Sequence, residues 1–404
     1  MKLKELHAVL KRSFNLEAGT VPVPETGQRF ENFTFSSEAT DLLRNAGKGN
    51  PAPVLGDGAE DAEERELSDR VALAADSEIA ENANFRYAVL LPAGESRPDA
   101  AIVLLHGLNE RVWDKYLPWA SELSAGTGKA VVLFPMAFHM NRSPPSWNDS
   151  RPMRRLSRFR LKARPETLCS SLSNAAISAR LSSDPSRFFW SGLQSYRDVC
   201  GFFRLVRDGG HPLLAPGAKL DLFTYSIGSF LGEILSCADE EGLFSASRLL
   251  CLCGGPVFDR LYPTSKFILD SAAAADAYSF WAENLESREK LDPALGRALA
   301  DVPGTWFKAF LNFDSAREFR ESRLRALAPR ISALAFSGDS VVHANEVRNT
   351  LQGARGDVPI PISLLQPSYP CRHEDPFPVG EIRQADSVDA TFKYVLSGFC
   401  RFLS

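Results

Sequence analysis

Residues 221–232 read Asp-Leu-Phe-Thr-Tyr-Ser-Ile-Gly-Ser-Phe-Leu-Gly. The apolar run before Ser226 predicts a buried strand, and Ser229 to Ser236 predict a helix. A sharp turn between this strand and this helix would have Ser226 at its apex and Gly228 two residues later. Such a turn would expose the Ser226 hydroxyl above a sheet, with the N-terminus of the helix facing it. The stretch therefore predicts a nucleophilic serine. The alternatives are an ordinary loop serine or one that caps a core helix.

Short apolar runs recur along the chain and alternate with helical patterns. Strands are predicted at 85–91, 101–105, 130–135, 219–225, 247–253, 331–336 and 359–365. Helices are predicted at 113–125, 193–208, 229–237 and 386–403. Fully apolar strands suit a parallel sheet that is covered on both faces. The alternation predicts an α/β fold with a doubly wound, mostly parallel sheet and helices on both faces.

Two intervals, 137–190 and 256–330, are far longer than ordinary strand-to-helix connections. Long insertions at the carboxyl ends of strands lie over the active site in doubly wound sheets, so both are predicted to be lid elements. Residues 1–84 are predicted to form an N-terminal helix and an extended arm, because 16–65 is rich in Gly, Pro and acidic residues and shows little periodicity. A catalytic domain is predicted over 85–404.

The predicted N-terminal helix is amphipathic, with Leu3, Leu6, Leu10 and Phe14 on one face. Packing on the main domain or on a second subunit is favoured over contact with a membrane surface. The first fifteen residues lack the apolar stretch of a secretory signal, and no segment approaches the ~20 apolar residues of a spanning helix. We therefore expect no transmembrane segment and a cytoplasmic location.

Charge and cysteine content narrow the function classes. The net charge of −4 gives no reason to propose a nucleic-acid partner. The seven cysteines, an odd number without close pairing, favour a reducing compartment. Cys251 and Cys253 have no matching Cys or His pair beside them, so they are interpreted as core residues and no metal site is predicted.

Four motifs follow predicted strands in a set order. They are His106-Gly107-Leu108-Asn109, Ser226, Asp339 and His373. Their order resembles the α/β-hydrolase superfamily, and the resemblance covers roughly 85–404. It implies that Ser226 is the nucleophile, Asp339 the acid and His373 the base, and that neither a metal nor an organic cofactor is needed.

One residue departs from the superfamily pattern. The pattern at the turn is Gly-x-Ser-x-Gly, and Thr224 stands at its first glycine, whereas Gly228 keeps the second. Small residues are needed because strand and helix pass close together at the bend. Thr is larger, although a branched side chain is favourable at a strand end. The departure concerns the geometry of the turn more than the fold.

The resemblance also implies an oxyanion hole. Its donors would be the backbone N–H groups of Leu108 and Ile227, each worth ~3 kcal/mol in the transition state. The Asn109 side chain would add a contact. His106 and Gly107 would then be structural residues of the same segment.

The acid and the base each have a rival. Asp339 follows a buried strand, where a carboxylate can orient an imidazole, but a Gly-Asp turn is the structural alternative. Glu346 is the nearest other acid, within the predicted helix 345–351. His373 follows the last predicted strand on a Pro-rich loop. His343 is its competitor as a residue that lines the same pocket, although it lies only four residues after Asp339.

A basic run in the first insertion consists of Arg151, Arg154, Arg155, Arg158, Arg160, Lys162 and Arg164. On a helix, Arg151, Arg155, Arg158 and Lys162 would share a face that could receive a phosphate or carboxylate of the substrate. The alternative is a solvated face that pairs with the acidic residues of 57–66. We favour the alternative.

Together these features predict a serine hydrolase that acts on a small-molecule ester or thioester through an acyl-enzyme. Two other functions use the same features. One is a non-catalytic binding protein that keeps the hydrolase fold, which Thr224 and the long N-terminal arm would allow. The other is acyl transfer by the same triad to an acceptor other than water.

Overall fold

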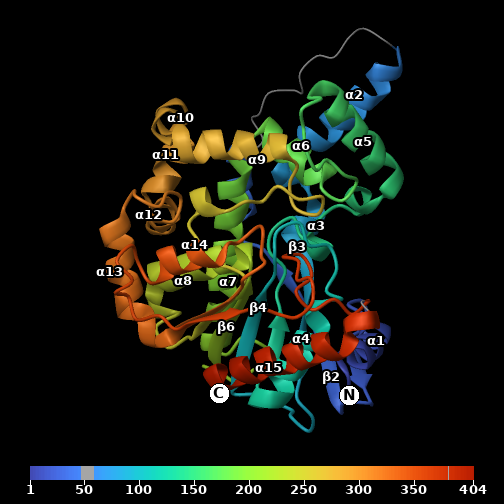
Figure 1. Ribbon diagram of the computed structural model, residues 1–404, viewed down its shortest axis with the longest axis vertical. Coiled ribbons are helices and arrows are strands. Elements are labelled where there is room, and N and C mark those ends of the chain that lie inside the picture. The colour runs from blue at the N-terminus through green and yellow to red at the C-terminus, as the bar shows by residue number, and fades with distance from the viewer. Residues whose placement is uncertain (47–58, 381) are drawn as a thin grey trace.

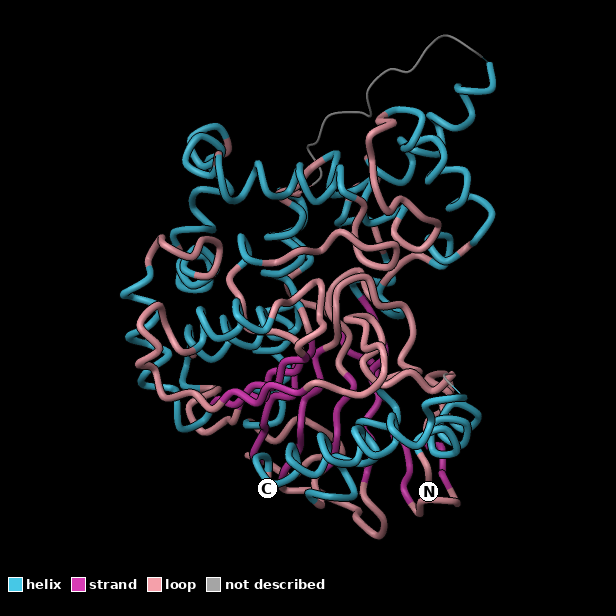
Figure 2. Tube along the Cα trace, in the orientation of Figure 1, coloured by secondary structure: helices cyan, strands magenta, loops and turns pink. Residues whose placement is uncertain are grey.

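The computed structural model describes residues 1–46, 59–380 and 382–404, and its strands form one sheet. The strand order is β1-β2-β3-β5-β4-β6-β7-β8-β9. The strands are β1 (Thr20–Val23), β2 (Gln28–Ser36), β3 (Asn84–Leu91), β4 (Ala100–Leu105), β5 (Ala130–Leu133), β6 (Lys219–Tyr225), β7 (Leu249–Leu252), β8 (Ile331–Phe336) and β9 (Ile362–Leu365). Figure 2 shows them together in the lower half of the molecule, with helices around and above them.

The sheet is parallel from β5 through β4 to β9, and antiparallel where β1, β2 and β3 join it. The parallel strands β4 to β8 are predominantly apolar and buried, as a sheet covered on both faces requires, whereas the edge strand β9 is partly exposed. The order also crosses over: β4 pairs with both β5 and β6. The predicted doubly wound fold of the α/β-hydrolase type is confirmed.

Helices cover both faces of the sheet. One face carries α1 (Leu3–Ser13), α4 (Tyr116–Thr127) and α15 (Ala385–Leu403); the other carries α7 (Arg187–Arg207), α8 (Ile227–Ala238), α13 (Arg317–Leu327) and α14 (Ala344–Leu351). Neighbouring strand residues face opposite layers. Val103 packs in the core cluster beneath α7 and α8, and Leu104 in the cluster beneath α4 and α15.

The N-terminal helix α1 packs on the main domain. It contacts α4 and α15, and Leu3, Leu6 and Leu10 are buried there. Its backbone is tied to α15 by a hydrogen bond from the Leu3 N–H to Asp389 Oδ1, 2.7 Å long. Packing of this amphipathic helix on the main domain, one of the two predicted arrangements, is confirmed.

Residues 20–36 differ from the extended arm predicted over 16–65. They form the hairpin β1–β2, and β2 pairs along its length with β3. Phe30 packs in the core cluster on one face of the sheet, whereas Phe33 and Phe35 pack against the cluster on the other face. Burial of aromatic rings on both faces stabilises this segment as sheet. A domain boundary at residue 84 stays a prediction.

A layer of helices lies beyond the carboxyl ends of the parallel strands, in the upper half of Figure 1. This helical layer comprises α2 (Ala59–Ala72), α5 (Ser150–Ala163), α6 (Ala175–Ser183), α9 (Ser271–Tyr278), α10 (Leu285–Leu291), α11 (Pro293–Ala300) and α12 (Val302–Ala309). The short α3 (Ala80–Ala83) precedes β3. Most of the layer comes from the insertions 137–190 and 256–330; α2 joins it from the N-terminal side by packing on α5 and α6.

Two further observations concern membranes and disulfides. Among the described helices, none combines the length and the apolar character needed to cross a membrane. All seven cysteines are free thiols. Cys251 and Cys253 are buried, in agreement with their interpretation as core residues.

Candidate active site

Ser226 occupies a strained turn between β6 and α8. Its backbone has φ 57° and ψ −123°, a region that costs a non-glycine residue about 1–3 kcal/mol. Gly228 explains how the turn stays tight: a Cβ there would lie 2.5 Å from the Leu105 carbonyl oxygen and 2.8 Å from that of His106. The first turn of α8 therefore sits directly against the end of β4, as the predicted elbow requires.

Thr224 fits the turn because the opposite helix leaves room for it. A Cβ on Gly232 of α8 would lie 2.9 Å from Thr224 Cγ2. The buried Thr224 hydroxyl donates to the Leu250 carbonyl at 3.0 Å and lies 3.0 Å from Ser229 Oγ. Ser229 in turn packs against Gly254: a Cβ on Gly254 would lie 2.2 Å from the Ser229 hydroxyl oxygen. The superfamily pattern has a small residue at position 224 of the strand, whereas in this protein the small residue at this contact is Gly232 of the facing helix α8.

The three predicted residues Ser226, Asp339 and His373 form one hydrogen-bonded chain. Ser226 Oγ lies 2.7 Å from His373 Nε2, and His373 Nδ1 lies 2.8 Å from Asp339 Oδ2. Asp339 Oδ1 accepts the backbone N–H groups of Val341 and Val342 at 2.9 and 2.8 Å. With Nδ1–H donated to the carboxylate, Nε2 faces the serine hydroxyl as an acceptor. Asp339 and His373 are each 3% exposed, so water does not compete for these bonds.

Tyr225, the residue before Ser226, positions the histidine loop. Its hydroxyl donates to the His373 carbonyl, and its ring stacks on the imidazole with centroids 5.6 Å apart. Lys115 Nζ lies 4.6 Å above the Tyr225 ring and donates to the Glu374 carbonyl at 2.7 Å. Burial raises the pKa of Tyr225 well above its ordinary value, so the phenol keeps its proton. The sequence analysis did not single out this residue.

The segment after β4 is held by hydrogen bonds of buried groups. His106 Nε2 accepts the Met136 N–H at 3.0 Å, which leaves Nδ1–H to donate to the Gly107 carbonyl at 2.9 Å. Burial lowers the pKa of His106 well below its ordinary value, so the ring is neutral. The Gly107 N–H donates to the Tyr116 hydroxyl at 2.9 Å. His106 and Gly107 thus shape the loop, as expected of structural residues.

Asn109 connects this loop to both insertions. Its side-chain amide donates to the carbonyl of Ser173 at 2.8 Å and to that of Phe267 at 2.7 Å. Both of its N–H bonds are used in this way, which leaves none for the predicted contact with an oxyanion. Leu108 and Ile227, whose backbone N–H groups are the other predicted donors, both line an apolar pocket beside the turn.

Neither rival residue reaches the hydrogen-bonded chain. His343 is exposed and packs against the Tyr262 ring, with centroids 4.8 Å apart. Glu346 lies in α14 and accepts a hydrogen bond from Asn349 at 3.3 Å. His343 also lines neither the cleft that contains Ser226 nor the apolar pocket beside it, contrary to the expectation that it shares the substrate pocket.

The basic helix α5 places Arg155 and Arg158 away from Ser226. Arg155 donates to Glu63 at 3.1 Å, and Arg158 is exposed to solvent. Neither lines the cleft or the apolar pocket. Pairing with the acidic segment, the favoured interpretation, is confirmed for Arg155. Residues 57 and 58 of that segment lie outside the described residues.

Comparison with protein families gives one match, and it spans residues 1–404. The matching model is described as a family of unknown function, DUF6051. The chain belongs to the DUF6051 family. No curated protein matches this DUF6051 chain.

Solved structures with the same fold include several esterases. Carboxyl esterase 2 of the fungus Tuber melanosporum is 12% identical with a TM-score of 0.46, over 80% of this chain and 82% of that one. A thermostable esterase of Pseudomonas putida ECU1011 is 13% identical with a TM-score of 0.43, over 91% and 98%. Esterase Est22 is 13% identical with a TM-score of 0.45, over 98% and 87%. At such identities the likeness concerns the fold alone.

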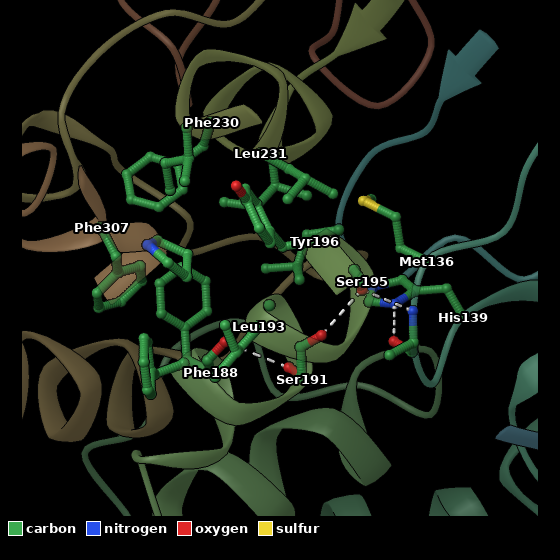
Figure 3. A pocket seen from close by; sticks show the side chains of 17 residues that line it. Met136, His139, Phe188, Ser191, Leu193, Ser195, Tyr196, Phe230, Leu231 and Phe307 are labelled. Carbon is green, nitrogen blue, oxygen red and sulfur yellow. Dashed lines mark hydrogen bonds between the residues drawn. The ribbon is translucent and has the colours of Figure 1, made fainter. Parts of the chain in front are cut away.

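Two hollows adjoin Ser226 in the DUF6051 chain. The cleft has a volume of about 240 Å³ and is lined by Ser226, His373, Glu374, Tyr225, residues 107–112, Ser173, Phe267 and Ile268. The apolar pocket has a volume of about 80 Å³ and is lined mainly by side chains of α7, α8 and α12. Figure 3 shows Phe188, Phe230 and Phe307 on one side of this pocket and Met136 and His139 on the other. Both insertions thus contribute to walls beside Ser226.

The charge state of the apolar pocket follows from its burial. Burial lowers the pKa of His139 to about 4, so the ring is neutral near pH 7, with Nδ1–H donated to the Ala137 carbonyl at 2.8 Å. The other polar groups on its wall are the hydroxyls of Ser191, Ser195 and Tyr196. Ser191 and Ser195 donate to helix carbonyls, and Tyr196 donates to Glu240 at 2.9 Å. The pocket therefore suits an uncharged, apolar group.

No metal centre is indicated by the side chains that the structure describes. Groups of three or more His, Cys, Asp or Glu residues placed to hold an ion do not occur among them.

Proposed function

We propose that this protein is a serine hydrolase that cleaves a carboxylic ester or thioester through an acyl-enzyme. The observation that carries the proposal is the continuous chain from Ser226 Oγ to His373 and Asp339, with steps of 2.7 and 2.8 Å. A separation beyond about 5 Å would have favoured a binding protein without catalysis. The strained φ of 57° at Ser226 is also of the kind that functional sites maintain.

In the proposed mechanism, His373 takes the Ser226 proton as Oγ attacks the acyl carbonyl. Asp339 holds the imidazole in the required tautomer and stabilises the cation that forms. The N–H groups of Leu108 and Ile227 bind the oxyanion and contribute ~3 kcal/mol each. His373 then protonates the leaving group, and the same residue activates the water that releases the acid.

The acyl chain would occupy the apolar pocket. Leu108 and Ile227 line that pocket, so it begins at the groups proposed to hold the oxyanion. Its volume of about 80 Å³ favours short acyl chains over long ones. The cleft of about 240 Å³ reaches Ser226 and His373 and would admit the alcohol or thiol part.

The test is Ser226→Ala with 4-nitrophenyl acetate as substrate. Turnover should fall on the order of 10⁵-fold or more, because the variant has no nucleophile. The matched control is Ser236→Ala, another serine of α8, whose hydroxyl only bonds back to the Gly232 carbonyl at 2.8 Å. The control should keep its turnover.

Covalent labelling checks the same assignment. A fluorophosphonate probe should label the wild type at Ser226 and leave Ser226→Ala unlabelled, while circular dichroism shows both folded. A folded wild type that neither labels nor turns over any member of an ester and thioester panel would contradict the proposal.

A further inference from the structure

Arg111 is a cation of the cleft that the proposed mechanism does not use. It lies two residues after Asn109 and lines the cleft together with Ser226 and His373. It also lines an adjacent cavity of about 70 Å³, where Leu108 and His139 form part of the wall. Its side chain therefore lies between two hollows that meet at residues 106–110, the loop after β4, called the oxyanion loop.

All the hydrogen-bond partners of Arg111 are neutral. Nη1 donates to the Trp147 carbonyl and to Asn148 Oδ1, the latter at 2.5 Å. Nη2 donates to the Ser173 carbonyl at 2.8 Å and to Asn109 Oδ1 at 3.4 Å. Among the residues that the structure describes, none accepts the Nε–H. The Nε–H group of the Arg111 guanidinium is thus left to donate to a ligand.

The other cations of the adjacent cavity are balanced, whereas Arg111 is not. Arg180 and Arg187 both pair with Asp76, and Asp184 adds to the negative charge near Arg180. Glu110, the acid next to Arg111 in sequence, pairs with Lys115. Within the described ranges 1–46, 59–380 and 382–404, no carboxylate forms an ion pair with Arg111.

A partly buried guanidinium without a carboxylate partner is electrostatically unfavourable. Burial lowers the pKa of Arg111, yet an arginine stays protonated in proteins, so its charge persists. Burying a charge without a counter-charge costs free energy that an incoming anion would recover. An anion that enters the cleft would therefore be attracted to this side chain.

We propose that Arg111 binds an anionic group of the substrate, a carboxylate or a phosphate, while the acyl carbonyl lies at Ser226. This inference rests on the proposed hydrolase function and names its substrate class. It replaces the surface residues Arg155 and Arg158 with a residue that lines the cleft itself. Arg111 would act as a specificity-determining residue and would take no part in bond breaking.

The structural alternative is that Arg111 only anchors the first insertion. It joins the oxyanion loop to Trp147, Asn148 and Ser173, and this role needs no anion. The two roles differ in one measurable respect. An anchor affects neutral and anionic substrates alike, whereas a binding group affects their ratio.

The experiment measures the ratio of kcat/KM for matched anionic and neutral esters in the wild type. With the charge on the acyl side, the pair is 4-nitrophenyl hemisuccinate and 4-nitrophenyl 4-methylpentanoate. With the charge on the leaving group, the pair is 3-acetoxybenzoate and 3-tolyl acetate. A hydrogen bond to a charged group predicts a preference for the anion of about tenfold to a hundredfold in one of the pairs. The favoured pair shows on which side of the scissile bond the anion lies.

Two variants separate charge from anchoring. Arg111→Gln keeps hydrogen-bonding groups but removes the charge, so the preference should fall to near unity. Arg111→Lys keeps the charge and should retain a preference above unity, although reduced. The matched control is Arg154→Gln on α5, an exposed residue outside the cleft, which should keep the wild-type ratio. Because each ratio is internal to one protein, partial unfolding does not alter it.

The outcomes separate the role proposed for Arg111 from the hydrolase function on which it rests. Turnover of neutral esters with no anionic preference in either pair would overturn the role of Arg111 and leave the hydrolase function standing. Absence of turnover with all four esters and with the wider ester and thioester panel, together with no fluorophosphonate labelling, would overturn the function itself. If neither variant folds, a wild-type ratio near unity in both pairs still overturns the proposal, and added NaCl from 0.05 to 0.5 M should weaken a true preference.

Discussion

The hydrogen-bonded residues at the carboxyl edge of the sheet and the two hollows beside them are built in different ways. At the sheet edge, each polar group of the site has a near partner: Asp339 accepts two backbone N–H groups and His373, and Ser226 meets His373. Beside the edge, the walls of the apolar pocket are mostly apolar side chains from α7, α8 and α12. Arg111, on the loop after β4, forms no ion pair with a carboxylate of the described residues. The polar groups of the edge therefore bond to one another, while the two hollows leave space and a positive charge for a substrate.

That difference suggests that turnover and selectivity are separable in this protein. Changes to the hydrogen-bonded residues at the sheet edge should lower the rate for all substrates, and changes in the walls of the two hollows should alter which substrates react. A single variant that does both would argue against the division. Asp339→Asn, Gly192→Leu and Thr224→Gly test this division in order of decreasing expected effect.

Among variants that keep the serine nucleophile, the largest effect is expected for Asp339→Asn. An amide at this position can accept the backbone N–H groups but would favour the wrong imidazole tautomer, and the same change in a serine protease lowers kcat about 10⁴-fold. We expect a loss of that order, equal for 4-nitrophenyl acetate and hexanoate. Steady-state kinetics with both esters measures it. The control Asp314→Asn changes an exposed acid that pairs only with Arg317.

An intermediate effect is expected for Gly192→Leu in the wall of the apolar pocket. Gly192 lines the apolar pocket on α7, and a Cβ added there would meet no atom within 4 Å. The leucine should fill the pocket and lower kcat/KM for the hexanoate about tenfold to a hundredfold relative to the acetate. Replacing a helical glycine should also preserve or raise stability, by up to about 1 kcal/mol.

Two further variants control the Gly192 experiment. Gly192→Ala should give a smaller shift in the same direction. Gly201→Ala, on the same helix, adds a methyl that meets only Phe35 at an ordinary 3.5 Å and should leave the chain-length ratio unchanged. An equal loss for both esters would mean that the pocket does not hold the acyl chain.

The same division explains what the sequence could predict. The ends of β4, β6, β8 and β9 are marked locally, because an apolar run stops there at a polar residue. This placed Ser226, Asp339 and His373 at one edge in the correct order, and the structure brings them within hydrogen-bond distance. Tyr225 carried the same local signal, since it stands directly before Ser226, but its hydrogen bond to the histidine loop joins residues far apart in the chain.

Features that depend on remote partners could not be predicted in this way. The hairpin at 20–36 is stabilised by pairing with β3, about fifty residues later, and its own Gly and Pro content suggested an arm. Asn109 sits in a motif that suggested an oxyanion contact, yet its amide meets carbonyls of Ser173 and Phe267. The charge of Arg111 is informative only once it is known that the carboxylates of Glu110 and Asp76, which line the same cavity, pair with other cations.

The smallest effect is expected where the chain departs from the elbow pattern, at Thr224. Restoring the pattern with Thr224→Gly should leave kcat/KM within about threefold, because Gly232 already makes room for the threonine methyl. Stability should fall by about 1–2 kcal/mol, since a strand loses a side chain and a buried hydrogen bond to the Leu250 carbonyl. Urea denaturation measures the loss, and Thr224→Val shows how much of it comes from the hydroxyl. A tenfold rise in turnover would instead mean that threonine holds Ser226 away from its best geometry. The hydrogen-bonded residues at the sheet edge would then not be arranged for the highest rate.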